Sequence, residues 1–225
     1  MHIVLSLGGS LVNTEHGIDK DYLAKIKNIV EKSEAFFGIV VGGGFAARKK
    51  AKKLREKGAS EFDCDTAAIK ITWKNANLVI DALGSIAYPK VIKDFYKARK
   101  LAETNKVVVM GGTIPGITTD TDSVLLAEAL KATRLVNISN TDAIYDSNPK
   151  DNPHAKKYDK LSYDELIELA IKNDKRTAGT NFIFDMLACK LLARSKIEAH
   201  FVSGKNLHDV ENAINGRQHS GTVVR

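Results

Sequence analysis

The sequence predicts an α/β protein with three layers, in which a mostly parallel central sheet lies between two layers of helices. Short runs rich in β-branched residues alternate along the chain with segments whose apolar residues recur every three or four positions. This alternation places helices on both faces of parallel strands. Glycine clusters follow three of the runs, at positions where open α/β sheets place their ligands.

Six strands are expected in chain order, with helices in the intervals between them. They cover residues 2–7, 37–41, 106–110, 134–139, 198–203 and 221–225. The first interval carries an amphipathic helix with Leu23, Ile26, Ile29 and Val30 on one face. Ser162 and Glu165 form a capping-box pattern that predicts the start of another helix. Residues 142–158 are polar, contain two prolines and are expected to form a long loop.

Length and composition predict one globular domain over residues 1–225. The chain has 225 residues, of which 44% are hydrophobic and 27% charged, both within the ordinary range for globular proteins. No apolar run approaches the roughly 18 residues of a membrane span, and the first residues form a strand pattern rather than a secretion signal. We therefore expect a cytoplasmic protein without a membrane partner.

The net charge of +7 suits an anionic partner, either a nucleic acid or a small phosphorylated metabolite. Much of the excess lies in residues 48–57, which form a predicted helix without interleaved aromatic residues. Such a run is typical of a solvated helix face, so no nucleic-acid partner is expected. Cys64 and Cys189 are too few for a disulfide framework or a zinc site and are expected to be free thiols.

The three glycine clusters are the first sign of chemistry. Each of them, at residues 8–9, 42–44 and 111–112, follows a predicted strand. Glycine lets the backbone approach a phosphate closely and direct N–H groups at it, and a following helix adds a favourable dipole. A single cluster is equally well explained as a tight turn. Three together indicate two phosphate-bearing ligands held side by side.

Residues 111–122 combine a glycine turn, two adjacent threonines and two carboxylates ahead of a predicted helix. Thr118 and Thr119 offer hydroxyl groups to a base, ribose or phosphate. Asp120 is suited to hold a ribose, a metal or a catalytic lysine. Thr119 and Asp122 also fit a helix-start signal, a role compatible with binding. Neither the P-loop nor the dinucleotide-binding fingerprint is present, so a P-loop kinase and a dinucleotide dehydrogenase are disfavoured.

Five segments taken in order resemble the amino acid kinase superfamily, and their spacing is similar to that of archaeal uridylate kinases. They are LGGS (7–10), VVGGGFAAR (40–48), GGTIPGITTD (111–120), NISNTDAIYDSNP (137–149) and AGTNFIFDMLACKLLARSKI (178–197). The resemblance covers essentially the whole chain. It implies an amino acid kinase fold with the acceptor over the N-terminal half and ATP over the C-terminal half.

The resemblance also implies roles for individual residues. On the ATP side it assigns Gly9, Ser10, Gly44, Arg48, Ser139, Asn140, Tyr145 and Asn148, with Tyr145 against the adenine. On the side of the acceptor, UMP, it assigns Gly43, Asp65, Thr113, Ile114, Pro115, Gly116, Ile117, Thr118 and Thr119. Arg48, Asp120 and Lys190 are the predicted catalytic residues, and no side chain is predicted to be a dedicated metal ligand.

Two positions depart from the family pattern. Many members carry a lysine in the first strand that stabilises the transferring phosphoryl group, and here that position is Ser6. Lys190, similar to a lysine on the corresponding helix of carboxylate-phosphorylating relatives, is one candidate for the missing charge, and Arg48 is the other. Asn148 stands where the family has an aspartate.

The implied reaction is transfer of the ATP γ-phosphoryl group to UMP, which gives UDP and ADP in pyrimidine nucleotide biosynthesis. Mg²⁺ and ATP are the implied cofactors, a homohexamer is the usual assembly of the family, and UTP is a frequent inhibitor. Two alternatives stay open. One is a kinase of the same superfamily with a carbamate, carboxylate or isopentenyl phosphate acceptor, and the other is a non-catalytic nucleotide sensor or storage subunit.

Overall fold

A seven-stranded sheet forms the centre of the computed structural model, which describes residues 1–149, 152–173 and 184–225. The strand order is β5-β4-β1-β6-β10-β11-β9. The strands are β1 (His2–Leu7), β4 (Phe36–Val41), β5 (Val107–Met110), β6 (Arg134–Ser139), β9 (Lys160–Leu161), β10 (Glu198–Ser203) and β11 (Thr222–Val224). The strands from β5 to β10 in this order pair in parallel, and β11 is antiparallel to β10. The predicted mostly parallel sheet is confirmed.

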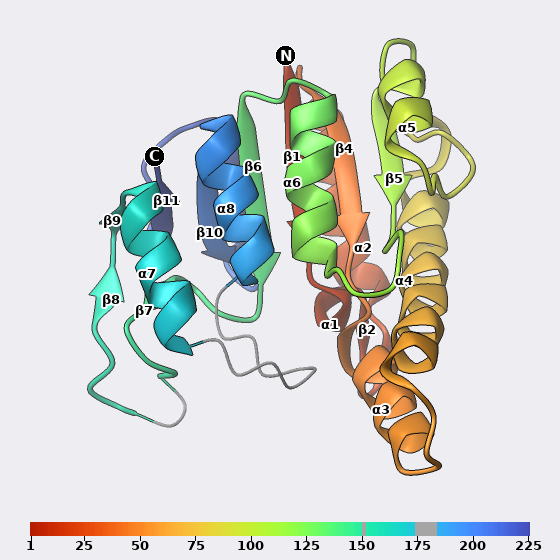
Figure 1. Cartoon of the computed structure of the whole chain (residues 1–225). Coiled ribbons are helices and arrows are strands. Elements are labelled where there is room, and N and C mark those ends of the chain that lie inside the picture. The colour runs from red at the N-terminus through yellow and green to blue at the C-terminus, as the bar shows by residue number, and fades with distance from the viewer. Residues whose placement is uncertain (150–151, 174–183) are drawn as a thin grey trace.

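Helices cover both faces of the sheet, which gives the three expected layers (Figure 1). One layer contains α5 (Phe95–Leu101), α6 (Thr119–Ala129), α7 (Tyr163–Asn173) and α8 (Met186–Ser195). The opposite layer contains α2 (Lys20–Lys32), α4 (Glu61–Leu83) and α9 (Leu207–Ile214). The short α1 (Gly9–Val12) follows β1, and α3 (Gly44–Arg55) packs against α4 beyond the edge of the sheet.

Alternate side chains of each strand point to opposite faces of the sheet and pack into two apolar cores, one on each face. In β1, Val4 faces the layer that contains α6, whereas Ile3 and Leu5 face the layer that contains α2. Gly38 of β4 leaves room for α6, because a Cβ there would lie 2.8 Å from side-chain atoms of both Leu126 and Leu130. Close packing of α6 on β4 sets the N-terminus of α6 at the carboxyl edge of the parallel strands.

Several elements match the predicted ones closely. The strands at 2–7, 134–139 and 198–203 have the expected bounds. The capping box is also confirmed, since the Ser162 backbone N–H donates to Glu165 Oε2 at 2.8 Å and the Glu165 N–H donates to Ser162 Oγ at 3.2 Å. Cys64 and Cys189 are both free and buried, as expected.

Two local predictions were wrong. The segment 142–158 is not entirely loop, because β7 (Ile144–Tyr145) and β8 (Lys157–Tyr158) pair as a short antiparallel ladder. Two-residue strands carry no periodicity, which is why the sequence pattern missed them. The cap of α6 is Thr118 rather than Thr119, since the Thr118 hydroxyl accepts the backbone N–H groups of Asp120 and Thr121.

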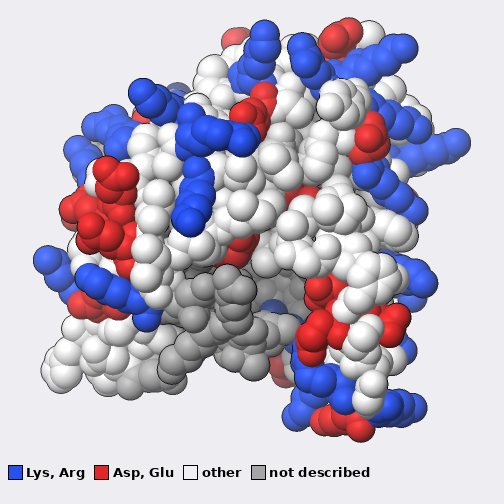
Figure 2. Space-filling view, in the orientation of Figure 1, with Lys and Arg blue, Asp and Glu red and all other residues white. Residues whose placement is uncertain are grey.

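The basic helix α3 carries charges of both signs around it. Arg55 pairs with Glu61 at 2.6 Å, and Lys52 lies 4.0 Å from Glu56. Figure 2 shows Lys and Arg side chains next to Asp and Glu side chains over the projecting end of α3 and α4. This mixture agrees with the solvated helix face predicted from the sequence. Within the described ranges, no helix has both the length and the apolar content of a membrane span.

Candidate functional site

The first two glycine turns touch each other at the carboxyl edge of the sheet. A Cβ on Gly9 would lie 2.1 Å from the Gly42 carbonyl oxygen, and a Cβ on Gly44 would lie 2.6 Å from the Gly9 carbonyl carbon. Gly44 also has a φ of +63°, which L side chains rarely adopt. Glycine is therefore required here because two backbones meet, one from the end of β1 and one from the end of β4.

Two helices begin at this junction, α1 at Gly9 and α3 at Gly44. The cap of α3 is Gly43, which supplies no side chain to the first N–H groups of the helix. Such N–H groups are the usual ligands of phosphate oxygens. Arg48 lies one turn further along α3 and is exposed. The junction thus offers backbone donors, with the positively charged residue Arg48 one turn away along α3.

The third glycine turn is held by the middle of α4. Thr72 Oγ1 accepts the Gly112 N–H at 2.7 Å, and Trp73 Nε1 donates to the Gly112 carbonyl oxygen at 2.8 Å. Gly111 packs so tightly that a Cβ would lie 2.5 Å from Thr72 Oγ1. These contacts fix the start of the predicted acceptor loop against α4, which belongs to the helical layer that also contains α2 and α9.

The loop after this turn is bonded at both ends, and its side chains include several predicted UMP ligands. Thr113 donates its hydroxyl to Asp122 Oδ1 at 2.6 Å, and the Gly116 N–H donates to Asp65 Oδ2 at 2.9 Å. Asp65 reaches across from α4, so the structure brings it together with the loop as the prediction requires. Ile114, in the same loop, is 58% exposed.

The two threonines at the start of α6 differ in their surroundings. The Thr118 hydroxyl is used within the protein, where it caps α6 and donates to Asp185. Thr119 Oγ1 lies beside the second glycine turn, 3.6 Å from where a Cβ of Gly42 would be. Of the two, Thr119 is the one whose hydroxyl faces the glycine junction.

Asp120 lies over the sheet between the two halves of the edge. Its Oδ1 atom accepts from Ser6 Oγ of β1 and from Asn137 Nδ2 of β6, both at 3.4 Å. These two residues are partners in the parallel register of β1 and β6. Ser6, at the position of the family lysine, thus points at Asp120. Both contacts are long, so the carboxylate keeps most of its capacity to accept.

Three carboxylates cluster around the N-terminus of α6, and burial together with their mutual repulsion raises the pKa of two of them. Burial raises the pKa of Asp120 to about 7, and the charges of Asp185 and Asp122 add to the effect. Burial likewise raises the pKa of Asp122 to about 6, against the lowering effect of its hydrogen bonds from Thr113. A nearby cation would relieve this repulsion and favour the ionised forms.

The predicted ATP residues form a second group, built from side chains. Asn140 Nδ2 donates to Ser10 Oγ at 2.9 Å and so connects the segment after β6 to the first glycine turn. The Ser139 hydroxyl bonds within its own turn to Thr141. Tyr145 donates its hydroxyl to the Asp142 carboxylate at 3.0 and 3.1 Å. The Asn148 carbonyl accepts the Asn152 N–H at 2.9 Å.

Lys190 is not brought to the junction by any contact in the described part of the chain. It lies on α8, whose buried residues Ala188, Cys189 and Leu192 form the packed face of that helix, and its own side chain is exposed. The cap of α8 is Asp185, which accepts the Ala188 N–H at 3.0 Å and the Thr121 hydroxyl at 3.0 Å. Residues 178–183, which also contributed to the resemblance, lie outside the described residues.

Sequence reasoning missed the residue that supports the second glycine turn. Asn75 of α4 is completely buried and donates to the carbonyl oxygens of Gly42 and Gly43 at 2.9 and 3.3 Å. Asn13, just after α1, donates to Asn75 Oδ1 at 3.4 Å. An amide in line with the apolar residues Ala76, Val79 and Leu83 was the available signal, since a buried polar group needs partners.

Comparison with known proteins gives results that agree along the whole chain. The model of the amino acid kinase family matches residues 1–203. The uridylate kinase of Archaeoglobus fulgidus is 41% identical over 224 residues, which cover 100% of both chains. The uridylate kinase of Thermococcus kodakarensis is 42% identical over 226 residues, which cover 100% of this chain and 99% of that one.

Solved structures show the same likeness in three dimensions. The crystal structure of the Archaeoglobus fulgidus uridylate kinase superposes with a TM-score of 0.84 at 39% identity and covers 100% of both chains. The UMP kinase of Bacillus anthracis superposes with a TM-score of 0.82 at 20% identity, over 100% of this chain and 95% of that one, which shows the shared fold. From the matched family model, the full-length relatives and the fold, the chain belongs to the amino acid kinase family.

Proposed function

We propose that this protein is a UMP kinase, which transfers the γ-phosphoryl group of ATP to UMP and releases UDP and ADP. The observation that carries the proposal is the contact of the Gly9 and Gly44 turns, where phosphate groups from two sides would meet. The full-length uridylate kinases at about 40% identity support the choice of acceptor. One domain would hold UMP over its N-terminal half and ATP over its C-terminal half.

In this proposal the acceptor lies along the second and third glycine turns. Gly43 faces the UMP phosphate, while Asp65 and the loop 113–119 hold the uridine. Support comes from the hydrogen bond between Asp65 and Gly116, which joins the two parts in one unit. The ATP phosphates approach Gly9, Ser10 and Gly44, and Ser139, Asn140, Tyr145 and Asn148 hold the rest of the nucleotide. The contact between Asn140 and Ser10 supports this second grouping.

The chemistry places modest demands on the protein. A phosphate oxygen of UMP attacks the γ-phosphorus, and the bond to the bridging oxygen breaks, so that ADP leaves with its electron pair. This oxygen is already ionised at neutral pH, so no general base is needed. The transition state is loose, and catalysis consists of aligning the two nucleotides and stabilising charge on the transferred group. Backbone N–H groups at the starts of α1 and α3 would do both.

Mg²⁺ fits the donor set at Asp120. Bound magnesium would offset the negative charge of the ATP phosphates. The Asp120 carboxylate has only two long hydrogen bonds, and its raised pKa reflects burial beside other carboxylates, a situation that a cation would relieve. Thr113 and Thr118 already donate to Asp122 and Asp185, so Asp120 is the carboxylate that would hold the ion.

A cation is still needed in place of the family lysine, because Ser6 is neutral. Arg48 is the stronger candidate, since it stands one turn from the Gly44 junction on α3. For Lys190 to supply this charge, its side chain would have to turn toward the junction from an exposed position on α8. A homohexameric assembly, inhibition by UTP and a cytoplasmic location complete the proposal, by analogy with the family.

An acceptor panel tests the proposal. Release of ADP from Mg-ATP would be measured with UMP, CMP, dTMP, isopentenyl phosphate and carbamate, each over a range of concentrations. We expect turnover with UMP at a kcat/KM well above that of every other acceptor. Preference for carbamate or isopentenyl phosphate would overturn the assignment. ATP binding without turnover on any acceptor would identify a sensor or storage protein.

A further inference from the structure

A polar cavity of about 730 Å³ lies on the β10–β11–β9 part of the sheet. Glu198 and His200 of β10 line it, together with β9 and the segment 216–221 that joins α9 to β11. Glu198 pairs in register with Arg134, the first residue of β6. The cavity therefore opens near the amino ends of the parallel strands, whereas the glycine turns occupy the carboxyl ends. Its volume is within the range of small-molecule sites, about 300 to 1,000 Å³.

Positive charge is in excess around the cavity. Its charged lining residues are Lys157, Lys160, Arg217, Arg225, Asp159 and Glu198. Glu198 is already engaged, since it accepts from Arg134 and His200 and lies 3.7 Å from Arg225 Nη1. Lys157 forms an ion pair with Asp142, with 3.7 Å between Nζ and Oδ2. In the described part of the chain, Lys160 and Arg217 form no ion pair, so their charges are available to a ligand.

The segment that carries Arg217 is fixed in place. The Arg217 N–H donates to the Asn212 carbonyl oxygen at 2.8 Å, and Ser220 donates both its N–H and its hydroxyl to the buried Asp209. Gly216 has a φ of +67° and packs on Arg134, where a Cβ would lie 2.3 Å from a guanidinium nitrogen. A ligand would thus meet a preorganised segment, which lowers the entropic cost of binding.

Two histidines connect this segment to the floor of the cavity. The Gly221 N–H donates to His219 Nδ1 at 3.1 Å, so His219 carries its proton on Nε2 and donates it to His200 Nδ1 at 2.7 Å. His200 in turn donates from Nε2 to Glu198 Oε1 at 2.9 Å. The chain of hydrogen bonds is complete with both rings neutral.

Burial keeps the two histidines neutral in the free protein. It lowers the pKa of His200 to about 4, against the opposing effect of Glu198, while His219 and Arg134 lower it further. Burial also lowers the pKa of His219, with Asp209 and Glu198 opposing and Lys157 reinforcing the shift. A negative ligand nearby would favour protonation and raise both values.

We propose that this cavity is a second anion-binding site, which takes a small phosphate-bearing molecule through Lys160, Arg217 and Arg225. Guanidinium groups match the paired oxygens of a phosphate, and a lysine adds a point charge. The ligand is either an inorganic polyphosphate or the phosphate group of a larger metabolite. The site is separate from the proposed kinase site, and its existence does not depend on the kinase activity.

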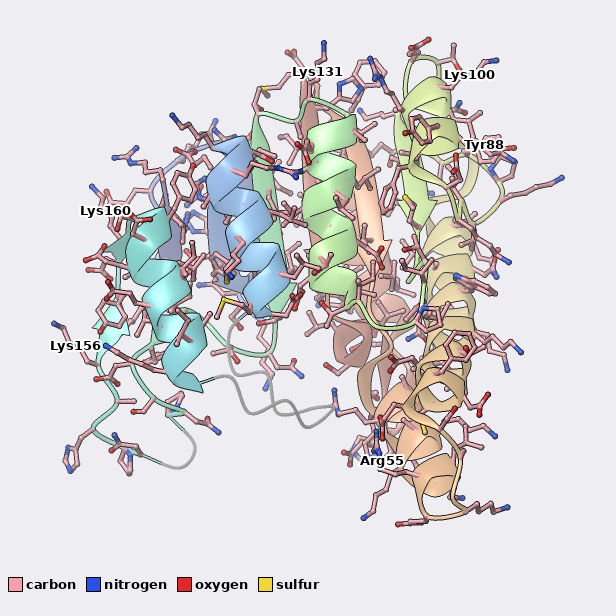
Figure 3. All side chains as sticks on the ribbon, viewed as in Figure 1. Arg55, Tyr88, Lys100, Lys131, Lys156 and Lys160 are labelled. Carbon is pink, nitrogen blue, oxygen red and sulfur yellow. The ribbon has the colours of Figure 1, made fainter. Side chains whose placement is uncertain are left out.

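The test uses the full chain and sodium pyrophosphate as the probe, with the imidazole NMR signals of His219 as the site-specific readout. Three proteins are compared: the wild type, Lys160→Gln/Arg217→Gln, and the control Arg99→Gln/Lys100→Gln. The control removes the same two charges from exposed positions on α5. Figure 3 shows Lys160 and Lys100 at opposite sides of the molecule. Circular dichroism confirms that each variant is folded.

We expect a saturable shift of the His219 signals and a higher His219 pKa at saturation. The Kd should rise about tenfold in Lys160→Gln/Arg217→Gln, as for the loss of charge-assisted hydrogen bonds at exposed positions, and stay within about twofold in the control. The titration is repeated with a nucleoside triphosphate. Tighter binding of the triphosphate would indicate a larger metabolite as the ligand, and tighter binding of pyrophosphate would indicate an inorganic polyphosphate. Absence of a saturable shift, or an equal Kd in all three proteins, would overturn the proposal.

Discussion

The two halves of the carboxyl edge are built in different ways. Over β1 and β4, backbone packs on backbone, and a single Cβ on Gly9 or Gly44 would lie within 2.6 Å of main-chain atoms. Over β6 and the segment after it, side chains bond to one another, as Asn140 does to Ser10 and Tyr145 to Asp142. The first arrangement leaves no room for an added side chain, whereas the second can lose one hydrogen bond and keep its conformation. Substitutions should therefore act sharply in one half and gradually in the other.

The largest effect is expected at Gly44. Gly44→Ala and the control Gly58→Ala both place a side chain at positive φ, +63° and +78°, but only Gly44 is crowded, since nothing lies within 4 Å of a Cβ on Gly58. Gly58→Ala should lower the unfolding free energy by about 1 to 2 kcal/mol, and Gly44→Ala should lower it further because of the added clash with the Gly9 backbone. Gly44→Ala should also lower kcat/KM about a hundredfold or more, because the turns must separate. Steady-state kinetics and urea unfolding check this, and equal kinetics in the two variants would contradict it.

Asp120, between the two halves, should show a large and pH-dependent effect. Its pKa is raised to about 7, so the carboxylate that would orient the cation forms only as the pH rises through that value. Wild-type kcat/KM should rise with pH around 7 and then level off. Asp120→Asn should lose that step and about tenfold or more of the rate above it, equivalent to about 1.4 kcal/mol. Asp81→Asn, exposed on α4, is the control.

The same group has a stability signature of opposite sign. A carboxyl whose pKa is raised on folding binds its proton more tightly in the folded state, so stability is lost as the pH rises from about 4 to 7. Asp120→Asn removes this loss and should make the protein more resistant to urea at pH 8 than the wild type. A less stable variant at pH 8 would argue that Asp120 is held by partners rather than strained by burial.

An intermediate effect is expected at Asn75, which donates hydrogen bonds to the second glycine turn. Asn75→Ala leaves the Gly42 and Gly43 carbonyl oxygens without their donor and should lower the unfolding free energy by about 1 to 3 kcal/mol. kcat should fall about tenfold, equivalent to about 1.4 kcal/mol. The control Asn77→Ala removes an exposed amide that bonds only within α4. If kcat stays unchanged while stability falls, Asn75 supports the fold and not the site.

The smallest effect is expected in the half built from side chains. Tyr145→Phe removes one hydroxyl, which is bonded to Asp142, and leaves the ring in place. The KM for ATP should rise by about threefold or less, since one exposed hydrogen bond contributes about 0.5 kcal/mol. A hundredfold rise, measured at saturating UMP, would show that this half is as intolerant of change as the other.

The limits of prediction from the sequence follow the same division. The strands at 2–7 and 134–139 could be predicted because each is an apolar run bounded by glycine or polar turns, a pattern that is visible in the local sequence. The glycine turns were found for the same reason, but their mutual contact depends on which strands become neighbours. Asn75 and Asp185 could not be assigned, since their partners lie 32 to 33 and 64 to 67 residues away along the chain. Such contacts exist only once the layers have packed.

A crystal structure with UMP, Mg²⁺ and a non-hydrolysable ATP analogue would show where the two nucleotides lie on the carboxyl edge of the sheet. We predict the UMP phosphate against Gly43 and the third glycine turn, the γ-phosphate analogue against Gly9 and Gly44, and the cation near Asp120. The two phosphates should then face each other across the contact of the first two glycine turns. Both nucleotides over the same half, or a γ-phosphate position away from Gly44, would show that the phosphates do not meet at these turns.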